Sequence, residues 1–112
     1  MSVPVPPEEM QAAVAEFGSL GFLMTTGADG RPRINHVRFN ASGAVLRAGV
    51  GGRTRQAIDA QPLVSCLWPG PDAGGMSLIA DGNATIVPVE GDDQLVEAVI
   101  EVTWAVRHRP PA

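Results

Sequence analysis

"VEAVIEVTWAVR", residues 96–107, decides between a helical and a β architecture for this chain. Apolar residues occupy every even position from Val96 to Val106, including Trp104, whereas two glutamates and an arginine lie at odd positions. A period of two with this many β-branched residues is typical of a strand with one buried face, because successive side chains point to opposite sides of a sheet. The stretch therefore predicts a long strand with a single apolar face.

The remaining chain consists of short apolar runs separated by turn residues, at 27–30, 40–43, 69–75 and 90–93. Further strands are predicted at 20–26, 33–40, 44–50, 62–68 and 76–88. An amphipathic helix is predicted over 6–17, and a shorter helix over 53–61 that Pro62 ends. We expect one domain, residues 1–112, that is mainly β: a six-stranded antiparallel split β-barrel with a short N-terminal helix and one short helix after the third strand.

The composition excludes several classes of protein. A net charge of −4 argues against nucleic-acid binding. The first ten residues lack the pattern of a secretion signal, and no apolar run has the length of a membrane span, so we expect a cytoplasmic protein that does not enter a membrane. Cys66 is a lone cysteine within "LVSCLW", where a buried, unreactive thiol is expected.

Positive charge is concentrated in one part of the sequence. Six of the eight basic residues, all arginines, fall between residues 31 and 55, where there is no acid, so this segment carries +6 and the rest of the chain −10. Within it, Gly49, Gly51 and Gly52 precede Arg53 at the predicted helix start. Glycines would let the backbone turn tightly with its amides pointing outward, and each arginine guanidinium can bind two phosphate oxygens in a bidentate manner. The loop predicts a phosphate site, although a plain turn followed by solvated arginines gives the same pattern.

Other residues that often carry chemistry have structural explanations here. His36 has no second histidine nearby, so no metal site is expected. It is predicted to be a hydrogen-bonded residue within a strand. Trp68 and Trp104 are typical of a core or a dimer interface, and a β-bulge is expected at Asp81 and Gly82. No hydrolytic triad or carboxylate pair is present, so no catalytic residue is assigned.

Three pieces of the sequence, in this order, resemble the pyridoxamine 5′-phosphate oxidase-like, FMN-binding split-barrel family, in particular its small actinobacterial members. They are "TTGADGRP", the basic loop leading to "QPLVSCLW", and "DGNAT" on the following strand. Gly52, Arg53 and Thr54 stand where flavin-binding members usually have Ser-Arg-Lys around the FMN phosphate, and the strand along the flavin ring corresponds to residues 35–40. The resemblance implies cofactor contacts at Asn35, His36, Val37, Asn40, Arg47, Ala48, Arg53, Thr54 and Arg55.

The resemblance also implies a function. We expect an FMN-binding flavoprotein that transfers hydride or electrons between a reduced nicotinamide or small organic substrate and the flavin. The alternatives are a deazaflavin-dependent reductase, because related barrels share the basic loop, and a non-catalytic flavin- or ligand-binding barrel. A homodimer is expected, since family members hold the cofactor in a cleft shared by two subunits and since a barrel of this size has little room to bury both apolar strands.

Overall fold

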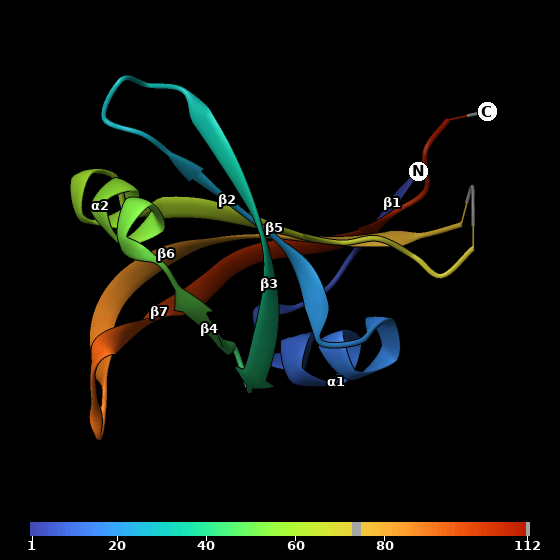
Figure 1. The fold of residues 1–112 in the computed structure, drawn as a ribbon. Helices are drawn as coiled ribbons and strands as arrows, with labels where there is room; N and C mark the ends of the chain where they lie inside the picture. The colour runs from blue at the N-terminus through green and yellow to red at the C-terminus, as the bar shows by residue number, and fades with distance from the viewer. Residues whose placement is uncertain (73–74, 112) are drawn as a thin grey trace.

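The computed structural model describes residues 1–72 and 75–111, so part of the predicted turn at 69–75 lies outside the described residues. Its elements follow the predicted order (Figure 1). They are β1 (Ser2–Pro4), the short 3-10 helix η1 (Pro7–Glu9), α1 (Met10–Phe17), β2 (Leu20–Thr26), β3 (Pro32–Ser42), β4 (Val45–Val50), α2 (Gly52–Ala60), β5 (Leu63–Trp68), β6 (Ser77–Val89) and β7 (Asp92–His108). The predicted mainly-β class is confirmed.

The strands form one antiparallel sheet in the order β1-β7-β4-β3-β2-β5-β6, and the additional pairing of β6 with β7 closes six of them into a barrel. The short strand β1 was not predicted; it pairs with the last residues of β7 as a seventh strand. Pro4 is the last residue of this strand and argued against predicting it, because proline is unfavourable in a strand except at an edge. Closure through β7 leaves the barrel without a free edge there.

The barrel is split between β3 and β4. Their pairing ends at Phe39 and Ala48, beyond which β3 pairs with β2 alone and β4 with β7 alone. The chain crosses this split at residues 49–52 and continues into α2, which lies beside the tip of the β2–β3 hairpin (Figure 1). The split and the start of α2 together form the region in which the sequence predicts a phosphate site.

The core fills the barrel and the face of α1, where Met10 and Val14 are buried and Phe17 packs against the cluster. Trp68 is fully buried and its ring lies 4.7 Å from that of Phe39, which confirms its expected place in the core. Cys66 is also buried, and burial raises the pKa of its thiol to about 12, with a further contribution from the negative charge of Asp81. The thiol is therefore protonated and unreactive at neutral pH, as predicted.

The expected bulge is present, and it corrects one prediction about β7. Asp81 pairs with Trp104 whereas Gly82 pairs with Val102, which leaves Thr103 as an extra residue on β7. The extra residue shifts the alternation, so Ala105 and Val106 are both buried and Trp104 is 49% exposed. The prediction that all even positions share one buried face was wrong beyond this point, because a period of two cannot reveal an inserted residue.

Candidate functional site

α2 begins in a conformation suited to binding an anion. Its cap residue, Gly51, has no side chain to accept hydrogen bonds from the first turn, and the first amide used in the helix is that of Arg55, which donates to the Gly51 carbonyl at 2.9 Å. The amides of the preceding turn are left without a helical acceptor and carry the positive end of the helix dipole. A phosphate group is the ligand that such a helix start accommodates best.

The glycines before α2 leave space rather than provide an unusual backbone. Gly51 has φ −87° and ψ −179°, which any residue adopts, and neither Gly49 nor Gly52 is among the glycines with positive φ. The backbone does turn within one residue, since only Gly51 separates β4 from α2, but it does so without a positive φ. A Cβ atom built on Gly49, Gly51 or Gly52 would meet nothing within 4 Å. Side chains at these positions would fill the open space next to the helix start.

Thr54 and Asn35 connect α2 to β3 across the split. Thr54 is buried, and its hydroxyl donates a hydrogen bond of 3.0 Å to the Asn35 side-chain oxygen. This bond fixes the first turn of α2 against the middle of β3. The hydroxyl proton of Thr54 is thereby engaged, so the residue offers an anion its backbone amide rather than its hydroxyl.

Arg53 and Arg33 face the same space. A hollow of about 240 Å³ is lined by Arg53 and Thr54 of α2 and by residues 32–35 of β3, and a second of about 320 Å³ lies between Arg53, Gln56 and the hairpin tip. Arg33 and Arg53 line both. Within residues 1–72 and 75–111, no ion pair or side-chain hydrogen bond engages the Arg53 guanidinium, so it is available to a ligand.

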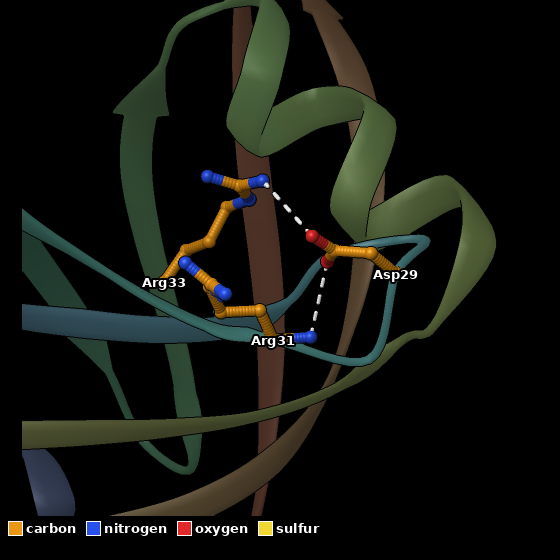
Figure 2. A network of polar contacts seen from close by, with 3 residues as sticks. All are labelled: Asp29, Arg31 and Arg33. Carbon is orange, nitrogen blue, oxygen red and sulfur yellow. Dashed lines mark hydrogen bonds and ion pairs between the residues drawn. The ribbon is translucent and has the colours of Figure 1, made fainter.

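Arg33 was missed by the sequence reasoning. Figure 2 shows the Asp29 carboxylate between the Arg33 guanidinium, at 3.8 Å, and the backbone amide of Arg31, at 3.0 Å. The pair is exposed and long, so it holds Arg33 only weakly. The available signal was strand alternation, because residues 33 and 35 of one strand share a face and Asn35 was already a candidate.

The other predicted contact residues are distributed over both faces of the sheet. Arg55 pairs with Asp59 at 3.9 Å along α2, and Arg47 pairs with Glu97 at 3.8 Å. Ala48 lies in the core, and Val37 packs against it. The opposite face of β3 carries His36, which stacks on Phe22 with ring centroids 4.9 Å apart, and the exposed Asn40, which lies opposite Arg47 in the β3–β4 pair.

The structure therefore brings together Asn35, Arg53 and Thr54, together with Arg33. The six arginines of the basic segment do not act as one site, because Arg38 donates to Ser19 and three others, Arg33, Arg47 and Arg55, have acidic partners. Among the described residues no group of three histidine, cysteine or acidic side chains is arranged to hold a metal ion. No helix in that part of the chain has the length and hydropathy needed to cross a membrane.

Comparison with known proteins gives the fold its name. No family model matches the sequence. Solved structures do match: a putative pyridoxamine 5′-phosphate oxidase from Listeria innocua has a TM-score of 0.76 at 19% identity, covering 91% of this chain and 98% of that one. The chain has the pyridoxamine 5′-phosphate oxidase-like split-barrel fold. An F420 reductase matches it with a TM-score of 0.74 at 25% identity over 90% of this chain and 98% of the other.

Proteins that share this split-barrel fold bind different groups. A FAD-binding protein from Mesorhizobium loti has a TM-score of 0.73 at 19% identity, covering 96% of this chain and 95% of that one. The heme storage protein HutZ from Vibrio cholerae has a TM-score of 0.71 at 14% identity, covering 88% and 95%. Split barrels thus include flavin- and F420-associated proteins and a heme-binding one.

In sequence, the chain is 39% identical over 70 residues to uncharacterized proteins from Mycobacterium bovis and Mycobacterium tuberculosis. The match covers 62% of this chain. The chain spans about half the length of these curated relatives, since the aligned part makes up 49% of them.

Proposed function

We propose that this split barrel binds FMN, with the phosphate held between the Arg53 guanidinium and the free amides at the start of α2. The observation that carries the proposal is the combination of Arg53, which has no ion pair within the described part of the chain, an uncapped helix start and open space beside three glycines. Arg53 and the backbone bind the phosphate, while the Thr54–Asn35 hydrogen bond keeps the amides aimed at it. Arg33 of β3 adds a second positive charge to the hollow that Arg53 of α2 lines.

Bound flavin would supply hydride or electron transfer between a reduced nicotinamide or small organic substrate and the ring. The task of the protein is then to hold the ring, exclude water from it and admit the substrate. We assign no catalytic residue, because no side chain of the site has the chemistry of a proton donor placed against a reacting atom. The predicted cytoplasmic location stays a prediction.

A deazaflavin cofactor is the second candidate, and one observation favours it. The hollow of about 320 Å³ continues beyond Arg53 along Gln56 and the hairpin tip, and it is lined by Arg33 and by the Asp29 carboxylate with which Arg33 forms a weak pair. FMN ends at its phosphate, whereas F420 continues from a phosphodiester into an acidic tail that would extend toward Arg33. The 25% identity with an F420 reductase agrees with this alternative.

The absorbance spectrum of the purified protein tests these proposals. We expect the flavin bands of a yellow protein, either as purified or after incubation with FMN and removal of the unbound cofactor, and bleaching of these bands when a reduced nicotinamide is added without oxygen. The shorter-wavelength band of a bound deazaflavin would favour the second candidate. A protein that stays colourless with both cofactors would contradict both and favour the non-catalytic alternative.

We also propose that the protein is a homodimer, because four large apolar side chains are exposed on one face of the sheet. The pairs Leu20–Arg38, Met24–Ile34, Met24–Ser65, Ser65–Asp81 and Asp81–Trp104 define this face by register. Leu20, Ile34, Leu63 and Trp104 lie on it with between 49% and 66% of their surface exposed. Several large apolar side chains exposed on one face of a sheet are typical of a subunit interface.

Sedimentation at micromolar concentration should give about twice the chain mass of 11.7 kDa. Ile34→Glu, which puts a charge on the patch, should shift the protein toward one chain mass. Leu95→Glu is the matched control, since Leu95 is 51% exposed but lies near the β6–β7 turn, and it should leave the dimer intact. A wild-type protein that sediments as a single chain would refute the dimer.

A further inference from the structure

A further hollow lies outside the arginine site, where β2 and β5 separate. Their pairing ends at Met24 and Ser65, and residues 25–26 of β2 diverge from residues 63–64 of β5. The resulting hollow has a volume of about 460 Å³ and is also lined by Asp81, Gly82 and Thr103. This volume lies in the range of ordinary small-molecule sites.

The hollow contains one charged group and that group has no counterion. The Asp81 carboxylate is half-buried, and one of its oxygens accepts a hydrogen bond of 2.6 Å from the Ser65 hydroxyl. No arginine or histidine forms an ion pair with it within residues 1–72 and 75–111. A partly desolvated carboxylate with a single neutral donor favours a cationic partner.

The surroundings of Asp81 are otherwise suited to an apolar molecule. Met24, Pro32, Leu63 and Val64 form the apolar part of the lining. Leu63 and Asp81 also lie on the sheet face proposed above for the dimer, so in a dimer formed through that face the partner subunit would border this hollow.

The position of the hollow connects it to the arginine site. Pro32, the first residue of β3, lines both this hollow and the hollow of about 240 Å³ beside Arg53. A molecule bound next to Asp81 would therefore lie across Pro32 from the region proposed for the cofactor.

We infer that this hollow binds a small molecule with an ammonium or similar cationic group on an apolar body, held by the Asp81 carboxylate. That this molecule is the substrate of the flavin reaction rests on the proposed function. The alternative is that the Ser65–Asp81 bond is a cross-strand contact with no ligand role.

Three probes of nearly equal size separate these possibilities: benzylammonium, benzyl alcohol and benzoate. Each is titrated into ¹⁵N-labelled protein while the amide signals of Met24, Ser65 and Thr103 are followed. We expect saturable binding of benzylammonium with a Kd at least about tenfold below that of the alcohol, and no binding of benzoate. Equal affinities for the three probes, or no saturable binding of benzylammonium, would overturn the inference without any variant.

Asp81→Asn should weaken benzylammonium binding by about tenfold while retaining an acceptor for the Ser65 hydroxyl. Glu101→Gln is the matched control, because Glu101 is an exposed acid opposite Asn83 on β6 and outside the lining of the hollow. An equal loss of benzylammonium affinity in both variants would mean that only the general surface charge matters, which would overturn the site. An Asp81→Asn variant with unchanged affinity for benzylammonium would also overturn it.

A separate FMN titration of the same proteins keeps the two proposals apart. If the wild-type protein does not bind FMN, the flavin proposal and the substrate role are refuted. Binding of benzylammonium that depends on Asp81 would still establish the site in that case. FMN binding without selective benzylammonium binding would refute the site alone.

Discussion

Arg53→Ala is expected to raise the Kd of FMN about tenfold to a hundredfold, because it removes a charged donor worth about 1.5–3 kcal/mol. The guanidinium lines both hollows of the site and has no partner within the described residues that would compensate for its loss. Riboflavin lacks the phosphate, so its affinity should change little. Quenching of flavin fluorescence at fixed salt measures both ligands with the same protein.

Arg31→Ala is the charge-matched control for this experiment. Arg31 lies at the hairpin tip next to Asp29 (Figure 2). Its side chain is not among the residues that line either hollow beside Arg53. Its removal takes away the same charge but no proposed contact to the phosphate. Arg31→Ala should therefore weaken FMN binding much less than Arg53→Ala does. An equal loss for FMN and riboflavin, or none for FMN, would show that Arg53 is an ordinary surface arginine.

Gly82→Ala should lower the free energy of unfolding by about 2 to 3 kcal/mol, the upper part of the range for overpacking a closely packed site. A Cβ atom on Gly82 would lie 2.5 Å from the Glu101 carbonyl oxygen and 2.7 Å from a methyl carbon of Ile100. The carbonyl belongs to β7 and cannot move without disturbing the longest strand pair of the barrel. Urea unfolding of wild type and variant measures the loss.

Gly49→Ala provides the comparison, because a Cβ atom there meets nothing within 4 Å and the residue lies in strand β4. It should stabilise the protein by about 0.5 kcal/mol, since alanine restricts the unfolded chain more than glycine does. A Gly82→Ala variant as stable as Gly49→Ala would mean that the bulge at residues 81–82 relaxes around an added methyl group.

The sequence predicted the order and type of almost every element because local signals agreed with the fold. Turn residues and alternation located β2 to β7, and Pro62 placed the end of the second helix within one residue of its observed last residue, Ala60. β1 was missed because its partner, the end of β7, is about 100 residues away in the sequence. Trp104 was assigned to the wrong face because the bulge that reverses the alternation depends on how β6 and β7 align.

The site was less predictable than the fold, because it forms between elements. Arg53 and Thr54 could be proposed from a helix start, but the contact between Thr54 and Asn35 depends on how far β3 and β4 separate. Arg33 reaches the same space only because the hairpin tip lies next to α2. The hollow beside Asp81 arises where β2 and β5 stop pairing, and nothing in either strand's composition marks that point.

β7 also has a consequence for the order in which the protein folds during its synthesis. It pairs with β6 through a two-residue turn, with β4 about 50 residues earlier, and at its far end with β1. The β2–β3 and β3–β4 hairpins can form as soon as they leave the ribosome, whereas the barrel cannot close until residue 108 has been made. Until then β4 and β6 each have an unpaired edge, so the nascent chain is most prone to association with other chains in the interval just before β7 emerges.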